Sequence, residues 1–336
     1  MGVVVVYGAT GHTGRFVVEE LLRGGVTTVA SGRDRNALEM LAAKWGDIEV
    51  RPAAVDDARS LDRALAGADV VVNCAGPFAV TGGPLVEAAV RAGIPYVDVA
   101  AEIEANVATF ANHRGARSLV VPAMAFYGGL GDLLVTAALG ERTAADEVHV
   151  AYGLSSWHPT PGTRAAGQVS HDRRGGRRLR FTRGALQYHD DKPVVQDWVF
   201  PEPLGRRRVI AEFTMTEVVT VPSHLDVPEV RTYMTVEAAQ DLLGEDTPPP
   251  TPVDALGRSD QTFVVDTVIR TSNEELRATA SGQDIYAITA PLAVGAVRRI
   301  LAGETRTSGL ASAGEMFDAR EFLDSLSPYL KVELPD

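Results

Sequence analysis

The stretch VVVVYGATGHTGR, residues 3–15, decides the fold of the first part of the chain. Its four consecutive valines are β-branched and apolar on both faces, as a buried parallel strand requires. Glycines follow at Gly8, Gly11 and Gly14, and helical apolar spacing begins at Thr13. A glycine turn between a strand and a helix is the context in which this spacing predicts a dinucleotide-binding loop.

The needs of a bound pyrophosphate explain each glycine of this loop. Gly8 permits the tight turn, Gly11 lets the backbone approach the phosphates, and Gly14 lets the helix pack closely on the sheet. The helix N-terminus adds free N–H groups and the positive end of its dipole. The residues expected to contact the cofactor here are Gly8, Thr10, Gly11, His12, Thr13 and Gly14.

The alternation of strand and helix continues to residue 122. Strands are expected at 26–31, 49–53, 69–73, 96–99 and 118–122, and helices at 36–45, 58–66, 83–92 and 104–114. Strands that alternate with helices of about ten residues predict a parallel, doubly wound sheet.

The sequence pattern changes after a helix expected at 132–139. Val/Thr/Phe-rich segments at 146–155, 207–221, 229–236, 261–271 and 275–281 predict antiparallel strands, and helices are expected at 286–303 and 319–326. We therefore expect an α/β chain with a discontinuous Rossmann-type domain, residues 1–125 and 284–336. A mostly antiparallel, β-rich α+β domain for substrate binding and dimerisation, residues 126–283, is inserted into it.

The end of the second predicted strand indicates which dinucleotide binds. An NAD-specific site usually has an acidic residue there for the ribose 2′-hydroxyl, but this chain has Ser31 and Arg33. The planar, permanently charged guanidinium of Arg33 suits a 2′-phosphate, so NADP(H) is expected. A surface arginine that begins the next helix, with Asp34 beside it, is the alternative interpretation.

Loops after the third and fourth strands are expected at the same ligand-binding edge of the sheet. Asp56 is placed to meet the adenine amino group, although helix capping explains an acidic pair there equally well. The small residues and the proline after the fourth strand allow backbone contact with the nicotinamide ribose. The expected contact residues are Asn73, Ala75, Gly76, Pro77 and Phe78. Cys74 is interpreted as a small strand-end residue, with a nucleophile as the alternative, because no basic partner is nearby in sequence.

Composition limits the partners. The 336 residues carry a net charge of -12, which argues against nucleic acid because phosphate neutralisation needs clustered cations. One cysteine excludes an internal disulfide and a cysteine-based metal cage, so no metal site is expected and a reducing compartment is indicated. The N-terminal apolar run is too short to span a membrane. A cytoplasmic protein that acts on a small-molecule substrate, without membrane contact, is expected.

Several segments together resemble the saccharopine dehydrogenase-like oxidoreductases. They are GATGHTGRFVVEELL, SGRDRNALEML, VVNCAGPFAVTGGPLVEAAVRAGIPYVDVAAE and the tail YAITAPLAVGAVRRILAGETRTSGLASAGEMFD, and they cover about 3–135 and 284–325. The resemblance implies an NAD(P)-binding Rossmann domain, an inserted substrate domain, a returning C-terminal helix and often a homodimer. It implies cofactor roles for Gly8, Thr10, Gly11, Thr13, Gly14, Arg33, Asn73, Gly76, Pro77 and Phe78.

Catalytic candidates are sought on loops that face the expected nicotinamide site. Asp98 follows the fifth strand, Tyr127 follows the sixth, and His158 follows a strand of the second unit. A scaffold role is an equal alternative for Asp98 and Tyr127, and a lone histidine is more often structural. Pocket-lining roles are also considered for Trp157 and for the segment 168–171.

Two motifs are weighed and set aside. The Arg-rich segment 173–183 could attract an anionic substrate, but a solvated strand face is the more common reason for such a run. Tyr188 and Lys192 have the spacing of the short-chain dehydrogenase pair, yet Pro193 and the absence of an apolar helical stripe argue against that role.

The preferred hypothesis is an NADPH-dependent reductase that delivers hydride to a C=N bond or an activated C=C bond of a small organic substrate. Members of the family that it resembles reduce imines or enoyl groups or run such reactions backwards. An amino-acid dehydrogenase of the saccharopine type, working in the oxidative direction, is the alternative within the same class. A non-catalytic NADP(H)-binding sensor is the alternative from another class.

Overall fold

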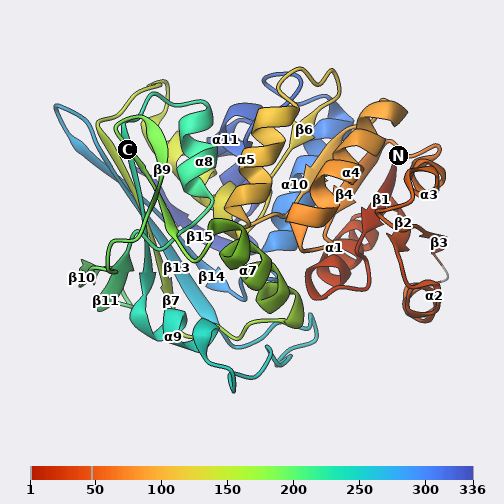
Figure 1. Cartoon of the computed structure of the whole chain (residues 1–336), viewed down its shortest axis with the longest axis horizontal. Coiled ribbons are helices and arrows are strands. Elements are labelled where there is room, and N and C mark those ends of the chain that lie inside the picture. Colours follow the sequence, from red (N-terminus) through yellow and green to blue (C-terminus); the bar gives the residue numbers. More distant parts are fainter. Residues whose placement is uncertain (1, 47, 336) are drawn as a thin grey trace.

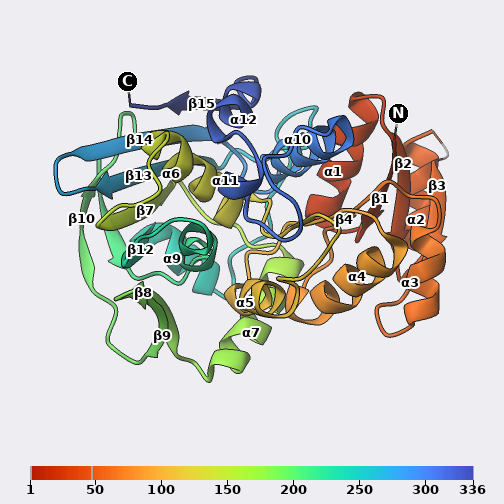
Figure 2. The same ribbon diagram turned by 90° about the horizontal axis from the view of Figure 1, so that it is seen from above.

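The computed structural model describes residues 2–46 and 48–335. Two sheets stand side by side, the smaller built from the N-terminal third of the chain and the larger from the middle and the extreme C-terminal part (Figures 1 and 2). No helix in this described part of the chain has the length and apolar character to cross a membrane.

The smaller sheet has six parallel strands in the order β3-β2-β1-β4-β5-β6. Their bounds are β1 Val3–Tyr7, β2 Thr27–Gly32, β3 Glu49–Pro52, β4 Val70–Asn73, β5 Tyr96–Asp98 and β6 Val120–Val121. The order reverses between β1 and β4, which is where ligands bind in doubly wound sheets. The expected Rossmann-type sheet is confirmed.

Helices cover both faces of this sheet. They are α1 His12–Arg23, α2 Arg35–Lys44, α3 Ala58–Leu65, α4 Phe78–Ala92 and α5 Ile103–Asn112. The valines of β1 serve both faces, since Val4 and Val6 pack in one apolar cluster and Val5 in another. Side chains cap two of the helices. Asp34 accepts a hydrogen bond from Ala37 N at the start of α2, and Asp57 accepts hydrogen bonds from Arg59 N and Ser60 N at the start of α3.

The larger sheet is mixed but mostly antiparallel. Its main order is β10-β11-β12-β7-β13-β14-β15, with β8 paired to β12 and β9 to β8; only β12 and β7 run parallel. The bounds are β7 Glu147–Leu154, β8 Arg178–Thr182, β9 Ala185–His189, β10 Val195–Val199, β11 Arg206–Ala211, β12 Glu229–Thr235, β13 Thr262–Arg270, β14 Glu275–Gln283 and β15 Leu330–Glu333.

The inserted part contains more helix than the sequence predicted. A π-turn at Phe126–Leu130 leads into α6 Gly131–Leu139, and α7 Pro161–Arg174, α8 Glu217–Thr220, a 3-10 turn at Val221–Ser223 and α9 Val236–Leu243 follow. The expected strand 207–221 is therefore wrong beyond Ala211, because the segment turns into α8. The Arg-rich segment 173–183 is likewise split between the end of α7 and strand β8.

The C-terminal part divides between the two sheets. Helix α10, Thr289–Ala302, returns to pack on α1 (Figures 1 and 2), and Gly303 ends it in the left-handed conformation. After α11 Ala313–Met316 and α12 Ala319–Ser325, which pack on α6, strand β15 joins β14 in the larger sheet. The sequence pattern placed all of 284–336 in the Rossmann domain, whereas strand β15 pairs with β14 of the larger sheet.

The two units share one apolar core. Val4 and Val6 of β1 belong to the same buried cluster as Val148 of β7 and Val265 of β13, with α6 and α10 between the sheets. Burying this surface favours the assembled form by about 25 cal/mol for each Å² of apolar area. The arrangement holds the loops at the carboxyl ends of β1 and β4 against the larger sheet.

Candidate functional site

The glycine loop has the close contacts that its sequence predicts. Gly8 has a φ of +85°, and a Cβ there would lie 2.7 Å from the N of Ala75 in the loop after β4. A Cβ on Gly14 would lie 2.1 Å from the carbonyl oxygen of Gly8, so α1 packs directly on the turn. Gly11 is exposed at the N-cap of α1, and no side chain caps that helix. Its free N–H groups form the anion cradle that a pyrophosphate requires.

Arg33 is exposed just after β2, and its guanidinium has no ion pair or hydrogen bond within residues 2–46 and 48–335. Asp34, not Arg33, caps α2, so the cation is left available. Arg33 and Asp56 both lie close enough to act on the pKa of the Tyr7 hydroxyl, which burial raises. The two expected adenosine-end residues therefore share one edge of the sheet.

The two neighbouring aspartates, Asp56 and Asp57, differ in their contacts. Asp57 accepts from Arg59 N and Ser60 N and caps α3, whereas Asp56 is exposed. Ser31 is fully buried, and its hydroxyl donates to Arg51 O at 2.7 Å, which fixes the distance between β2 and β3. Ser31 thus has a structural role through its side chain, and its carbonyl accepts from Gly8 N at 2.8 Å.

The loop after β4 is held in one conformation. The buried Asn73 side chain accepts from Ala75 N at 3.0 Å and donates to Tyr96 Oη at 3.1 Å. Helix α4 then begins at Phe78, five residues earlier than predicted, because the Glu102 carboxylate accepts from Phe78 N and Ala79 N at 2.7 and 3.0 Å. The Asn73 side chain is thus occupied inside the protein, and the cofactor contacts expected from this loop stay a prediction.

Asp98 lies in a scaffold and not in an open site. Its carboxylate accepts from Ala100 N at 3.0 Å, from Ala123 N at 2.8 Å and from Tyr96 Oη at 2.9 Å. Burial raises the pKa of Asp98, and the three hydrogen bonds oppose that rise. The structure therefore favours the scaffold alternative for Asp98. Cys74 is also buried, and burial raises the pKa of its thiol, which agrees with an inert side chain.

Aromatic side chains from both units form a wall beside the glycine loop. The ring of His12 meets the edge of Tyr286 at 5.1 Å, and Tyr127 lies 5.2 Å from Trp157, both between ring centroids. Trp157 Nε1 donates to the Tyr286 hydroxyl at 3.3 Å, which links the two pairs. The loop that would hold the phosphates thus faces side chains of the inserted part.

Two buried polar atoms of this aromatic wall have no hydrogen-bond partner in the described part of the chain: His12 Nε2 and the hydroxyl of Tyr127. Burial lowers the pKa of His12, although Asp284 partly offsets it, so the imidazole tends to be neutral. Burial, with the charges of Tyr286 and Glu217, raises the pKa of Tyr127. The phenol therefore keeps its proton and is able to donate it in a hydrogen bond.

A buried carboxylate lies behind Tyr127. Glu217 is fully buried and accepts from Gly128 N at 2.6 Å and from the hydroxyl of Tyr152. The Tyr152 ring contacts that of Tyr127 at 5.0 Å. Burial raises the pKa of Glu217, and hydrogen bonds oppose the rise. Sequence analysis did not find this group, because Glu217 was placed inside a predicted strand.

His158 lies at this site through its backbone. Its N–H donates to Gln261 Oε1 at 2.7 Å and its carbonyl accepts from Tyr286 Oη at 3.3 Å, so it helps to position Tyr286. The segment 168–171 does not line the site. Gln168 and His171 are exposed on α7, where they contact Asp172.

Tyr286 is the residue of the site that sequence reasoning missed. Its hydroxyl contacts four groups: Trp157 Nε1, His158 O, Thr160 N and Thr163 Oγ1. The only signal was its place at the start of the returning segment, next to Asp284, whose carboxylate accepts from Tyr286 N at 2.9 Å. The motif formed by Tyr188 and Lys192 is a coincidence, as expected, since Tyr188 lies in strand β9 and not on a helix.

Comparisons with known proteins agree with this geometry. Residues 4–120 match the family model described as saccharopine dehydrogenase NADP binding domain. A bovine (Bos taurus) protein called saccharopine dehydrogenase-like oxidoreductase is 32% identical over 117 residues, which cover 30% of this chain and 27% of that protein. A trans-acting enoyl reductase of Mycobacterium bovis is 33% identical over 106 residues, covering 30% of this chain and 25% of the reductase.

The fold of the whole chain has a match among solved structures. Apo saccharopine dehydrogenase (L-Glu forming) from Saccharomyces cerevisiae aligns with a TM-score of 0.69 and 12% identity, covering 99% of both chains. Such a low identity shows the fold alone. The curated relatives named above are matched over about a quarter of their length.

A dinucleotide-binding Rossmann domain joined to a mixed-sheet domain is thus the class that the fold and the site define. Within this class, residues 4–120 match the saccharopine dehydrogenase NADP binding domain, over about a third of the chain. The resemblance seen in the sequence and the expected cofactor, NADP(H), are confirmed.

Proposed function

We propose that this protein is an NADPH-dependent reductase that acts on a C=N bond or an activated C=C bond of a small organic substrate. The observation that carries the proposal is a chain of contacts from the phosphate loop to the inserted part: His12 meets the edge of Tyr286 in the returning segment, and the Tyr286 hydroxyl accepts from Trp157 Nε1 of the inserted part. A cofactor held by the loop would be next to side chains that belong to the other unit, where a substrate can be positioned.

The residues fit NADP(H) at both of its ends. Gly8 and Gly14 let the turn pack directly against Ala75 and against α1, and α1 has uncapped N–H groups for the pyrophosphate. Arg33 supplies a free guanidinium for the 2′-phosphate. When bound, NADPH supplies the hydride; the chain supplies position and exclusion of water.

The substrate side of the site is aromatic, with few polar atoms. Tyr127 and Trp157 offer buried rings, and the Tyr127 hydroxyl has no partner in the described chain. This hydroxyl would hold a proton near the substrate and deliver it where the reduced bond needs one. An iminium acceptor needs no such donor, so the two substrate types differ in their dependence on Tyr127. The name of the mycobacterial relative supports an enoyl substrate.

The cofactor assignment is tested by titrating NADPH and NADH against the wild-type protein and Arg33→Ala. A charged hydrogen bond contributes about 1.5–3 kcal/mol, so we expect NADPH to bind roughly 10- to 100-fold more weakly to Arg33→Ala. NADH affinity should stay unchanged. Arg35→Ala, which removes an exposed ion pair with Glu39, is the matched control. Unchanged NADPH affinity in Arg33→Ala would contradict the assignment.

The activity is tested by following NADPH oxidation with a panel of imines, enones and enoyl thioesters. Turnover of one class supports the reductase. NADP+ reduction with amino acids, without reductive turnover, would support the oxidative alternative. Stoichiometric NADPH binding with no turnover of any compound would favour the sensor.

A further inference from the structure

The Arg-rich segment 173–183 is not one solvated face. Arg173 donates to Ala79 O at 2.9 Å, and Arg174 lies 3.5 Å from Glu104, so these two fasten α7 to the Rossmann unit. Arg178 donates to three backbone carbonyls. Arg177 donates to Arg174 O at 3.2 Å and lies over the ring of Tyr188. Four of the arginines thus have structural partners, which leaves Arg180 and Arg183 to be explained.

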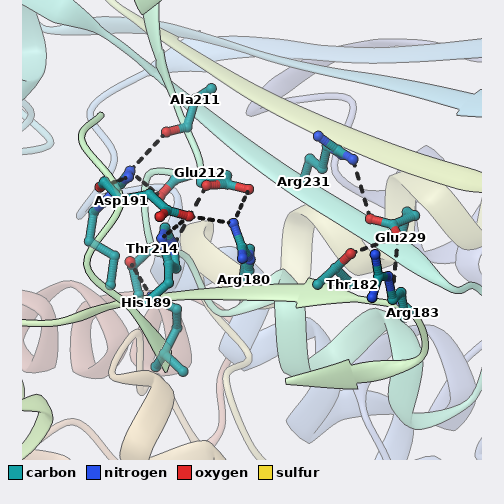
Figure 3. Close-up of polar contacts among 12 residues, drawn as sticks. Arg180, Thr182, Arg183, His189, Asp191, Ala211, Glu212, Thr214, Glu229 and Arg231 are labelled. Carbon is teal, nitrogen blue, oxygen red and sulfur yellow. Dashed lines mark hydrogen bonds and ion pairs between the residues drawn. The ribbon is translucent and has the colours of Figure 1, made fainter. Parts of the chain in front are cut away.

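A cavity of about 300 Å³ lies beside the β8–β9 hairpin, and it is lined by Arg180, Thr182, Arg183, Gln187, Glu212 and Arg231. Three guanidinium groups from three places in the chain therefore face one small volume (Figure 3). The pairing of Arg180 with Gln187 places both on the same face of the hairpin. A volume of this size is at the lower end for small-molecule sites.

The charged groups around the cavity are only partly paired. Glu229 is engaged by Thr182 Oγ1, by Arg183 N and by Arg231, as Figure 3 shows. Arg180 lies 2.8 Å from Asp191, a side chain that is 64% exposed, and 3.7 Å from Glu212 at the edge of the cavity. Exposed pairs such as that with Asp191 contribute little. The guanidinium of Arg183 has no partner among residues 2–46 and 48–335. The three guanidinium groups are matched in number by the carboxylates of Asp191, Glu212 and Glu229, but the Arg183 guanidinium itself forms no ion pair in the described chain.

Unsatisfied donors also point to a missing acceptor. The Nε atoms of Arg180 and Arg231 are buried without a hydrogen-bond partner in the described chain. A buried donor without a partner costs about 1–3 kcal/mol. The side-chain amide of Gln187 has no partner there either. An oxyanion that draws the two arginines toward the cavity would satisfy these groups.

The turn of the β8–β9 hairpin is a further observation that points to a ligand at the cavity. Thr182 pairs with Ala185, so Arg183 and Gly184 form a two-residue turn with φ angles of +54° and +70°. Such turns prefer Asn, Asp or Gly, because a larger side chain is strained at positive φ. Arginine at this position therefore costs stability, and it places a free cation at the rim of the cavity.

From these observations we infer that the cavity between the β8–β9 hairpin and β12 binds a small oxyanion, a phosphate or a carboxylate group. Bidentate contact with guanidinium groups is the usual recognition of both groups. In Figures 1 and 2 the hairpin lies on the side of the molecule away from β1 and β2, so this site is separate from the one proposed for NADP(H). The Glu212 carboxylate at its edge favours a ligand that also carries a hydrogen-bond donor.

The test is a calorimetric titration of the full chain, saturated with NADP+, with inorganic phosphate and, in a second arm, acetate, at constant ionic strength set with chloride. Arg183→Asn is the main variant, because asparagine suits the turn and the fold should keep or raise its melting temperature. Arg183→Gly repeats the test with the other preferred residue. Arg59→Asn, an exposed arginine on α3, is the control for charge.

We expect saturable binding of at least one of the two anions, and at least a fivefold loss of affinity in both Arg183 variants but not in Arg59→Asn. A stronger response to phosphate than to acetate identifies the phosphate group as the ligand, and the reverse identifies a carboxylate. Equal affinity in the wild type and the Arg183 variants, or no binding of either anion, overturns the inference. Because NADP+ occupies the nucleotide site, phosphate binding there cannot imitate the result.

Discussion

At the scale of single residues, the buried hydroxyl of Tyr127 lowers the stability of the folded protein. The Tyr127 side chain is surrounded by Phe126, Tyr152 and Trp157, and its oxygen is buried with no hydrogen-bond partner in the described chain. Replacing it with phenylalanine would remove an unsatisfied polar group at no cost in packing. A group that lowers stability at a ligand site is a candidate for function.

We therefore predict opposite effects on stability and activity for Tyr127→Phe. The free energy of unfolding should stay equal or rise by about 1 kcal/mol, since a buried unpaired hydroxyl is removed. If the substrate needs a proton, kcat should fall by roughly 10²-fold or more, with NADPH affinity unchanged. Denaturant unfolding and steady-state kinetics measure the two quantities. An unchanged kcat with every substrate that turns over would exclude Tyr127 as the proton donor.

Gly14 allows a sharper test at the same scale. In Gly14→Ala the new methyl group would lie 2.1 Å from the Gly8 carbonyl oxygen, and both partners belong to rigid backbone. We expect the unfolding free energy to fall by roughly 2 kcal/mol or more and NADPH binding to be lost.

The matched control for Gly14→Ala is Gly167→Ala in helix α7, where a Cβ meets nothing within 4 Å. That variant should gain up to about 1 kcal/mol, the difference in helix propensity between the two residues. Equal stability of the two variants in thermal or urea unfolding would contradict the close packing of the loop.

At the scale of elements, α7 shows where sequence reasoning stops. Only Ser170 of this helix is buried, so the segment 161–174 has no apolar stripe to reveal it. The end signals were present: Thr160 accepts from Thr163 N, Pro161 begins the helix, and Gly175 ends it in the left-handed conformation. The helix is stabilised by its ends and by polar contacts with α4 and α5.

The same contrast holds for the site. The glycine loop was predictable because its function depends on local backbone geometry within seven residues, from Gly8 to Gly14. Tyr286 was not, since its hydroxyl contacts residues more than 120 positions earlier. Asp98 was expected to have either a catalytic or a scaffold role, and only the structure shows the three internal hydrogen-bond donors that favour the scaffold. Hydrophobic periodicity reports only local structure, so it cannot predict contacts between the two units.

Helix α7 should depend on Tyr286. Tyr286→Phe removes the hydroxyl that joins Thr160, Thr163, Trp157 and His158, at a cost of about 1–3 kcal/mol. We expect amide hydrogen exchange of residues 161–174 to speed up by roughly tenfold for each 1.4 kcal/mol lost locally. Tyr188→Phe, an exposed tyrosine on β9, is the control. Unchanged exchange in α7 would show that its other contacts suffice.

At the scale of the whole molecule, a buried ion pair joins three distant segments. The Asp132 carboxylate of α6 lies 2.8 Å from His224 Nε2 and accepts from Gly314 N at 2.7 Å. Burial opposes the charged imidazole, but Asp132 and Glu315 outweigh it, so the pKa of His224 is raised. The pair holds the C-terminal segment against α6.

This raised pKa predicts a pH dependence of stability. Since the folded pKa of His224 exceeds the unfolded value of about 6.5, its contribution is complete below that pH and is lost as the pH rises through the folded pKa. The difference in unfolding free energy between the wild type and His224→Asn should therefore be largest near pH 6 and shrink above pH 7. Urea unfolding across this range measures it. A difference that is constant with pH would show that the pKa of His224 is the same in the folded and unfolded states, which would contradict the raised pKa.

The homodimer expected from the resemblance stays a prediction, because the structure describes one chain.

The packing of α10 on α1 also sets an order of events during synthesis. Helix α1 leaves the ribosome early, whereas its covering helix, Thr289–Ala302, is made more than 260 residues later. At about 5–20 residues per second the delay is on the order of ten seconds to a minute. Throughout this time Val17, Val18 and Leu21, which are buried in the finished protein, lack part of their cover. The nascent chain therefore exposes an apolar helix face during synthesis, and the nucleotide-binding domain can complete its folding only after α10, which ends at Ala302, has been made.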